Sequence, residues 1–341
     1  MFKRSRELQE SLRDKEWLKV RIERLIGKSL SWVRDRIARQ RLRIKWFKGG
    51  DEGPRVVRPE NVVWIFGSGR TGSTWLSEMM VSLADHTRWH EPLVGYLFGH
   101  AYQEQGTGRT DDRHFIFGGD RRVWMSSIRS FVLEQATARF PERLDDGYLV
   151  IKEPHGSLGA PLLMEALPES RMIFLVRDPR DVVASALDAH KKGGWAQVRS
   201  GKRKGPSPQK RPDHWPDRFV KSRSRNYLRD IQCVQQAYEA HGGRKVLVRY
   251  EDLRADPLGT MERIYRSLEI PADAGALARA VRRHSWERLP EGAKGEGKFY
   301  RKATPGGWRE DLTAEQVRIV EDITAPLLEW FYPERTKELR Q

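Results

Sequence analysis

The sequence of 341 residues is poor in cysteine and in long apolar runs. Its one cysteine, Cys233, cannot form a disulfide within the chain, and a single thiol excludes zinc sites built from several cysteines. No secretory signal is recognisable, and no apolar run has the length of a membrane-spanning helix. These absences predict a protein of a reducing, cytoplasmic compartment.

Acidic residues are also fewer than basic ones, and the excess of positive charge is unevenly distributed along the chain. The chain has 63 Lys and Arg against 47 Asp and Glu, a net charge of +16, and residues 1–48 supply +10 of it. Leu30, Val33, Ile37 and Ile44 recur at helical spacing within this segment. We therefore predict a basic amphipathic helical extension with a Gly- and Pro-containing linker at residues 1–54, followed by the main domain at residues 55–341.

The basic extension has two interpretations. A basic amphipathic helix can attach to an anionic membrane surface, which would make the protein peripheral on a membrane. It can equally dock on the main domain or remain a solvated helix. The sequence leaves both interpretations open.

The most informative segment is a glycine-rich loop behind an apolar run. Residues 61–66, Asn-Val-Val-Trp-Ile-Phe, have the composition of a buried strand, and Gly67-Ser-Gly-Arg-Thr-Gly-Ser-Thr-Trp75 follows at once. Leu76, Met79, Met80 and Leu83 then recur at helical spacing. A strand, a glycine loop and a helix start together direct backbone N–H groups at one point, which suits a phosphate or sulfate.

The loop departs from the usual nucleotide-binding pattern in one respect. The spacing from Gly67 to Gly72 matches G-x-x-x-x-G-K-[ST], but Ser73 stands where that pattern has lysine. The cation lies inside the loop instead, as Arg70. This substitution argues against an ordinary kinase or nucleotide hydrolase that acts on magnesium-bound ATP.

A second segment has the same strand-to-helix organisation. Residues 171–176 form an apolar strand pattern that ends at Arg177, and Pro179 suits the first turn of the helix that follows. Ser185 lies two turns along this helix, so Arg177 and Ser185 can face one anionic group. The two segments, in this order, resemble the sulfotransferase family that uses 3′-phosphoadenosine 5′-phosphosulfate (PAPS). The resemblance extends over most of residues 60–333.

The resemblance implies a three-layer α/β fold with a central parallel sheet and a P-loop-like phosphosulfate-binding loop. Strand patterns near residues 62–66, 148–152, 171–176 and 245–249 alternate with helical stretches, as that architecture requires. Two long helices are expected, at residues 217–240 and 313–332. The ligand is expected at the carboxyl ends of the strands.

The resemblance also implies how the donor is held. The first loop would cradle the 5′-phosphosulfate through Arg70, Thr71, Gly72, Ser73 and Thr74. Trp75 would stack on the adenine. Arg177 and Ser185 would grip the 3′-phosphate, and Tyr250, in a Tyr-Glu-Asp motif, would lie near the adenine. Arg301 and Lys302 resemble the start of a mobile loop that closes on the 3′-phosphate, although Ala303 replaces a glycine there.

Sulfuryl transfer further needs charge relief at the leaving phosphate and removal of the acceptor's proton. Arg70 and Lys152, which ends a strand pattern, are the predicted catalytic cations. Glu91, in a His-Glu-Pro-Leu segment resembling that of carbohydrate sulfotransferases, is the first candidate for the base. His155 ranks second, one position late for the Lys-x-His of cytosolic members, and Glu153 ranks third.

The predicted function is sulfuryl transfer from PAPS to a hydroxyl of a carbohydrate or glycolipid, and no metal is assigned. An acceptor that is a small alcohol or phenol, an atypical phosphotransferase and a nucleotide-binding adaptor at a membrane surface are the alternatives. Nucleic-acid binding is not predicted, because no recognition module appears and an anionic cofactor explains part of the need for cations.

Overall fold

The centre of the molecule is a sheet of parallel strands. The computed structural model describes residues 57–83, 86–105, 115–140, 147–191, 193–200 and 215–333. Within these ranges five strands pair in the order β2-β3-β1-β4-β5, and every pairing is parallel. In chain order the strands are β1 (Val62–Phe66), β2 (His86–His90), β3 (Tyr148–Lys152), β4 (Arg171–Val176) and β5 (Lys245–Arg249). The predicted extension and linker at residues 1–54 lie outside the described residues.

The strands form because their apolar residues fit a sheet that is covered on both faces. Alternate side chains of a strand point to opposite faces. In β1, Trp64 and Phe66 belong to one hydrophobic cluster, whereas Val63 and Ile65 belong to the other. A continuous apolar run is therefore what a parallel strand between two helical layers requires.

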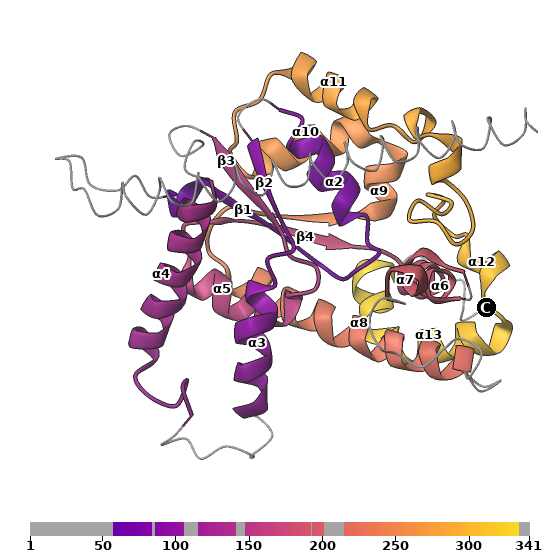
Figure 1. Ribbon diagram of the computed structural model, residues 1–341, viewed down its shortest axis with the longest axis horizontal. Helices are drawn as coiled ribbons and strands as arrows, with labels where there is room; N and C mark the ends of the chain where they lie inside the picture. Colours follow the sequence, from indigo (N-terminus) through magenta and orange to yellow (C-terminus); the bar gives the residue numbers. More distant parts are fainter. Residues whose placement is uncertain are drawn as a thin grey trace, which may run out of the picture. The chain divides into compact units, whose positions relative to one another are not determined.

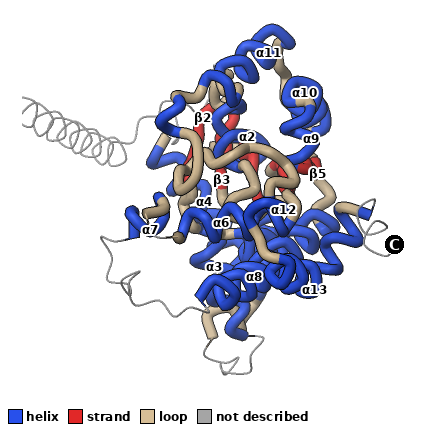
Figure 2. Tube along the Cα trace, turned by 90° about the vertical axis from the view of Figure 1, so that its right-hand side faces the viewer, coloured by secondary structure: helices blue, strands red, loops and turns tan. Residues whose placement is uncertain are grey.

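Helices cover both faces of the sheet (Figures 1 and 2). On one face lie α2 (Ser73–Met80), α9 (Tyr250–Ala255), α10 (Pro257–Ser267) and α11 (Ala274–Arg283). On the other lie α3 (Val94–Gln105), α4 (Arg121–Arg139), α5 (Ala160–Ala166), α8 (Trp215–Ala240) and α13 (Ala314–Phe331). Three further helices are α6 (Pro179–His190), α7 (Trp195–Ser200) and α12 (Trp308–Asp311). No helix in the described part of the chain is both long and apolar enough to cross a membrane.

The predicted three-layer α/β fold is confirmed. The four predicted strands coincide with β1, β3, β4 and β5, and the two long helices with α8 and α13. Pro179 occupies the first turn of α6, whose preceding residue, Asp178, accepts a hydrogen bond from the backbone N–H of Arg180. Strand β2 was not predicted; it lies at the edge of the sheet, paired only with β3.

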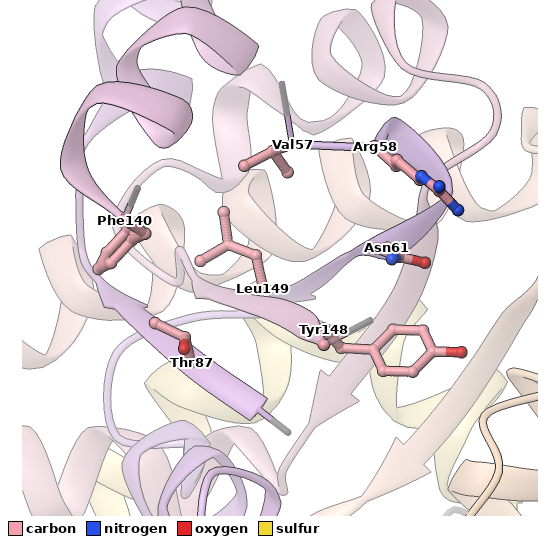
Figure 3. Close-up of a pocket in the computed structure, with 8 residues that line it drawn as sticks. Val57, Arg58, Asn61, Thr87, Phe140, Tyr148 and Leu149 are labelled. Atoms are coloured by element: carbon pink, nitrogen blue, oxygen red, sulfur yellow. The ribbon is translucent and has the colours of Figure 1, made fainter. Parts of the chain in front are cut away.

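The cavities at the two ends of the sheet differ in size. At the amino-terminal end, a hollow of about 10 Å³ beside the start of β3 has room for about one water molecule (Figure 3). Arg58, Asn61 and Tyr148 are among the residues around it. The large cavity of the described chain is lined by residues that follow the carboxyl ends of β1, β3 and β4, where ligands bind in sheets of this kind.

Candidate active site

The cavity has a volume of about 520 Å³, within the range of small-molecule sites. Its acidic lining residues are Glu78 and Glu91. Basic residues far outnumber them: Arg70, Lys152, Arg177, Arg223, Arg254, Arg283, Arg288, Arg301 and Lys302. Such an excess of positive charge favours an anionic ligand.

The glycine loop after β1 is shaped by two close backbone approaches. A side chain at Gly67 would collide with the carbonyl oxygen of Leu175 in β4. Gly72 has φ 90° and precedes α2, and a Cβ on it would lie 2.6 Å from the ring of Tyr250. Only glycine tolerates both the left-handed conformation and this contact. The loop therefore presents the first N–H groups of α2, starting at Ser73, to the cavity.

Arg70 lies in the loop with φ 75°, and its side chain reaches α6. Its Nε donates to Ser185 Oγ over 3.0 Å, and its Nη2 donates to the carbonyl oxygen of Phe299 over 2.8 Å. Burial lowers the pKa of Arg70 to about 10, with further contributions from the charges of Arg177 and Arg301. The guanidinium thus lies beside Ser185, so its predicted contact with the leaving oxygens of the donor stays a prediction.

Arg177 and Ser185, the predicted ligands of the 3′-phosphate, are both buried next to the loop. Arg177 donates from Nη1 to the carbonyl oxygen of Arg70 over 3.1 Å, and its guanidinium lies 4.3 Å from the ring centre of Tyr250. Its Nε is buried and has no hydrogen-bond partner within the described ranges. A buried donor without a partner is costly, and an anionic ligand would satisfy it.

Trp75 and Tyr250, the predicted neighbours of the adenine, lie edge to face with ring centres 6.3 Å apart. Trp75 Nε1 donates to the carbonyl oxygen of His284 over 2.8 Å, which fixes the indole. His284 follows α11 and also lines the cavity. The aromatic pair therefore provides a rigid apolar wall, as a purine ring requires.

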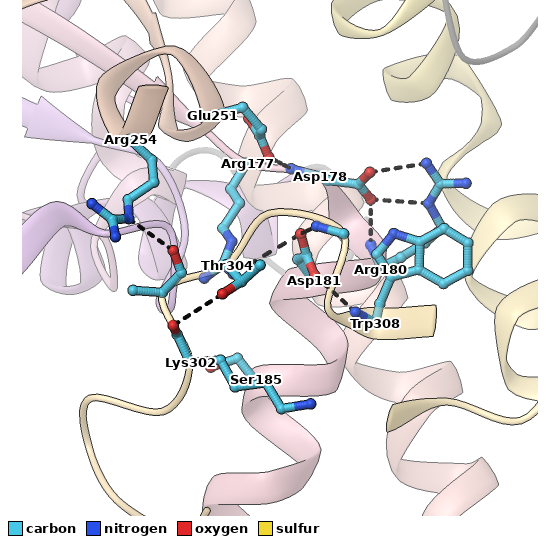
Figure 4. A network of polar contacts seen from close by, with 12 residues as sticks. Arg177, Asp178, Arg180, Asp181, Ser185, Glu251, Arg254, Lys302, Thr304 and Trp308 are labelled. Carbon is cyan, nitrogen blue, oxygen red and sulfur yellow. Dashed lines mark hydrogen bonds and ion pairs between the residues drawn. The ribbon is translucent and has the colours of Figure 1, made fainter. Parts of the chain in front are cut away.

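The segment that contains Arg301 and Lys302 is fastened to α6 (Figure 4). Asp181 accepts hydrogen bonds from the backbone N–H groups of Gly306, at 2.7 Å, and Trp308, at 3.0 Å. Ala303, which replaces the family's glycine, adopts φ 53°. The alanine thus takes the left-handed conformation in which glycine is favoured.

The two cations of this segment are paired with acids that follow them in the chain. Arg301 contacts Asp311, and Lys302 Nζ lies 2.7 Å from Glu310 and 3.1 Å from Asp311. Both Arg301 and Lys302 also line the cavity. They therefore lie at the cavity, and their contact with the 3′-phosphate stays a prediction.

A lysine, a glutamate and a histidine come together beyond the end of β3. Lys152 Nζ contacts Glu91 Oε1, and His155 Nε2 lies 3.9 Å from the same oxygen. The Lys152 side chain is 3% exposed, whereas that of His155 is 56% exposed. All three residues line the cavity. Glu91 and His155, the two leading candidates for the base, therefore lie next to each other in the cavity.

Electrostatics favour an ionised Glu91. Burial alone would raise the pKa of its carboxyl group, but the hydrogen bond and the charge of Lys152 outweigh burial and hold the pKa below the ordinary value. Burial lowers the pKa of His155. At neutral pH the carboxylate and the neutral imidazole can both accept a proton.

Glu153, the third candidate, points elsewhere. Its side chain is fully buried and accepts hydrogen bonds from the N–H groups of Leu93 and Gly95, each over 3.1 Å, at the start of α3. Burial raises its pKa to about 7. It does not line the cavity, and its two hydrogen bonds hold the start of α3.

One cavity residue escaped the sequence-based prediction. Arg223 of α8 donates from Nη2 to Ser68 Oγ over 3.0 Å and to the Gly69 carbonyl oxygen over 2.8 Å. Ser68 in turn donates to Asp230 Oδ2 over 3.1 Å. Arg223, Tyr227 and Asp230 recur at spacings of four and three on α8. Polar residues at this spacing share one face of a helix, so the sequence pattern could have predicted that this face lies against the site.

A metal site of protein ligands is not found in this part of the molecule. Over the described residues, no group of three or more His, Cys, Asp or Glu side chains could hold a metal ion. The candidate ligand contacts of the cavity are instead N–H groups, hydroxyls and cations.

Comparison with known proteins gives a family and a fold. A model described as "Sulfotransferase family" matches residues 63–274. The structure is similar to mouse sulfotransferase SULT7A1 complexed with PAP, with 12% identity, 81% of this chain and 87% of that chain covered, and a TM-score of 0.50. It is also similar to sulfotransferase STF9 from Mycobacterium avium, with 16% identity, coverage of 81% and 78%, and a TM-score of 0.52. No curated protein matches the chain.

Proposed function

The chain belongs to the sulfotransferase family, and we propose that this PAPS-dependent sulfotransferase transfers the sulfuryl group to a hydroxyl of a carbohydrate or glycolipid. The observation that carries the proposal is the contact of Lys152 with Glu91 in a cavity that the glycine loop also lines. A buried cation and an ionised carboxylate at one point supply charge relief and a base together.

The donor fits the cations and N–H groups of the cavity. The amides and hydroxyls of residues 71–74 would hold the phosphosulfate at the start of α2. Arg177, with its unpartnered Nε, and Ser185 would bind the 3′-phosphate. Arg301 and Lys302 would complete this clamp, while Trp75 and Tyr250 would enclose the adenine.

The reaction requires one bond to form at sulfur and one to break. The acceptor hydroxyl oxygen bonds to sulfur while the bond from sulfur to the bridging phosphate oxygen breaks. The hydroxyl proton passes to Glu91, and the electron pair of the broken bond stays on the phosphate of PAP. Lys152 and Arg70 would stabilise the charge that grows on the sulfuryl and leaving oxygens.

Glu91 is preferred as the base because Lys152 keeps it ionised and fixes its carboxylate. The Glu91 N–H also donates to the Lys152 carbonyl oxygen over 2.9 Å, which places the two side chains at adjacent points. His155 is the competing base, since it lies 3.9 Å from Glu91 and lines the same cavity.

A second class of acceptor is favoured by the apolar part of the lining. Trp195, Phe219 and Phe299 contribute aromatic rings to the cavity. Aromatic walls stack on sugars and also bind planar rings, so a small phenol or alcohol is the alternative acceptor.

The test is to incubate the full chain with radiolabelled PAPS and separated carbohydrate, lipid and small-molecule fractions of cells. We expect label to move into a carbohydrate or glycolipid product, and Glu91→Gln to abolish most of the transfer. A chelator should leave transfer unchanged. Label confined to aromatic small molecules would support the alternative acceptor, and no transfer to any fraction would contradict the proposed function.

A further inference from the structure

Arg223 is only partly used by the protein. Its Nη2 holds Ser68 and Gly69, whereas Nε and Nη1 donate to no residue within the described ranges. The guanidinium belongs to the cavity lining. It therefore offers unoccupied N–H groups to whatever lies in that part of the cavity.

No carboxylate balances this guanidinium at close range. In the described chain no ion pair within 4.0 Å involves Arg223, although Asp230 lies near enough to influence its charge. Asp230 is hydrogen-bonded to Ser68 instead. Burial lowers the pKa of Arg223 and raises that of Asp230 to about 6. A cation without a close counter-ion in a half-buried site attracts an anionic ligand.

The position of Arg223 relates it to the acceptor. A methyl group built on Gly69 would lie 2.9 Å from His155 Cε1 and 3.7 Å from Arg223 Nη2, so these two side chains converge on Gly69. His155 in turn lies 3.9 Å from Glu91. Arg177, by contrast, holds the carbonyl of Arg70, which contacts Ser185. Arg223 thus lies near His155, one of the two candidate bases, and Arg177 lies next to the predicted 3′-phosphate site.

We propose that the acceptor carries an anionic group near the hydroxyl that is sulfated, and that an N–H group of Arg223 not engaged by Ser68 or Gly69 binds this group. The inference rests on the proposed function, because it takes Glu91 or His155 as the base. A carboxylate, a sulfate or a phosphate on a sugar has the required chemistry, since each accepts a charge-assisted hydrogen bond from a guanidinium.

The test compares glycosides that differ in the group at C6, which is neutral in one and anionic in two. Calorimetry measures binding of p-nitrophenyl β-glucoside, its 6-sulfate and p-nitrophenyl β-glucuronide to the full chain saturated with PAP. We expect at least one anionic glycoside to bind about tenfold or more tightly than the glucoside, as for one charge-assisted contact. Arg223→Gln should remove this preference and leave the affinity for the glucoside nearly unchanged, and its affinity for PAP, measured alongside, shows whether the glycine loop is still supported.

Matched variants separate recognition from support of the loop. Arg225→Gln removes the same charge from an exposed position of α8 and should keep the preference. If Arg223→Gln fails to bind PAP, Arg223→Lys replaces it, and a preference reduced about threefold or more supports the inference. Equal binding of all three sugars to wild type, or a full preference in the Arg223 variant that still binds PAP, would overturn it. Failure of wild type to bind PAP would instead contradict the proposed function.

Discussion

Lys152 and Glu91 form an ion pair inside the cavity, and a backbone hydrogen bond between the same two residues holds their side chains side by side. Glu91 follows β2 and has φ 46°, an uncommon value for a residue with a side chain. Its N–H bonds to the carbonyl oxygen of Lys152, the last residue of β3. Strained backbone of this kind tends to occur at functional sites. The geometry thus supports a catalytic role for the pair, and the predictions below test it.

The first prediction concerns the base. Glu91→Gln keeps the size of the side chain but cannot take the proton, so turnover should fall about a hundredfold to ten-thousandfold. PAP affinity should be intact, and His155→Ala should be milder. A carboxylate is active when ionised, so kcat/KM should be lost as the pH falls through a pKa below the usual 4.5 of glutamate.

The pH profile also identifies the competing base. The pKa of His155 is lowered from 6.5 by burial. If His155 were the base, kcat/KM would be lost as the pH falls through a pKa below the usual 6.5 of histidine. Such a profile, together with a nearly active Glu91→Gln enzyme, would assign the base to His155 and favour small hydroxyl acceptors.

The second prediction separates Arg70 from Arg177. Arg70→Ala should lower kcat by about a hundredfold or more, because we assign Arg70 to charge that grows in the transition state. Arg177→Ala should chiefly weaken PAP binding. Steady-state kinetics and calorimetry on both variants measure the two effects. If Arg70→Ala changed only PAP affinity, its observed contact with Ser185 would be its working position, on the 3′-phosphate.

The third prediction is that Glu153→Gln keeps turnover but changes the pH dependence of stability. The folded-state pKa of Glu153 is raised from 4.5 to about 7, so its contribution to stability is present below about pH 4.5 and is lost as the pH rises through about 7. The amide cannot titrate. The unfolding free energy of the variant should therefore vary less than that of wild type across this interval, measured by urea denaturation. An inactive but folded variant would restore Glu153 as a candidate base.

The fourth prediction concerns the hydrogen bonds that fasten the segment containing Arg301 and Lys302 to α6. Asp181→Ala removes the acceptor of the Gly306 and Trp308 N–H groups, which should cost about 1–3 kcal/mol of stability. PAP affinity should fall as well, because Arg301 and Lys302 lose their fixed position. Thermal unfolding and calorimetry provide the measurements, with Asp322→Ala on the exposed side of α13 as the control. Unchanged PAP affinity would show that this loop takes no part in donor binding.

The sequence predicted the strands that contain an apolar run. Runs such as residues 62–66 and 171–176 are almost entirely apolar and are buried along their whole length. A strand of a parallel sheet with helices on both faces provides this burial, so such runs predict strands. Strand β2, His-Thr-Arg-Trp-His, lacks such a run, whereas β5, which also pairs on one side only, contains Val-Leu-Val. The place of β2 depends on pairing with β3, a tertiary contact that its own composition does not encode.

The cavity lining could be predicted where its residues lie at or after the carboxyl ends of strands. Lys152 ends β3, Arg177 directly follows β4, Arg70 lies in the loop after β1, and each lines the cavity. The choice between Glu91 and Glu153 depended on side-chain direction. The N–H of Glu153 continues the sheet by bonding to Ile65, and its carboxylate turns to α3. Arg223 reaches the loop from a helix more than a hundred residues away in sequence, so only the folded chain brings it there.

The most direct test of the donor site compares adenosine 3′,5′-bisphosphate with ATP in thermal unfolding of the full chain. The clamp that we propose, of Arg177, Ser185, Arg301 and Lys302, should be specific for a 3′-phosphate, which ATP lacks. At about a hundred times its dissociation constant, the bisphosphate should add about 2.7 kcal/mol of stability. ATP at the same concentration should add much less, and Arg177→Ala should remove most of the difference. Equal stabilisation by the two nucleotides would contradict a site built for PAPS.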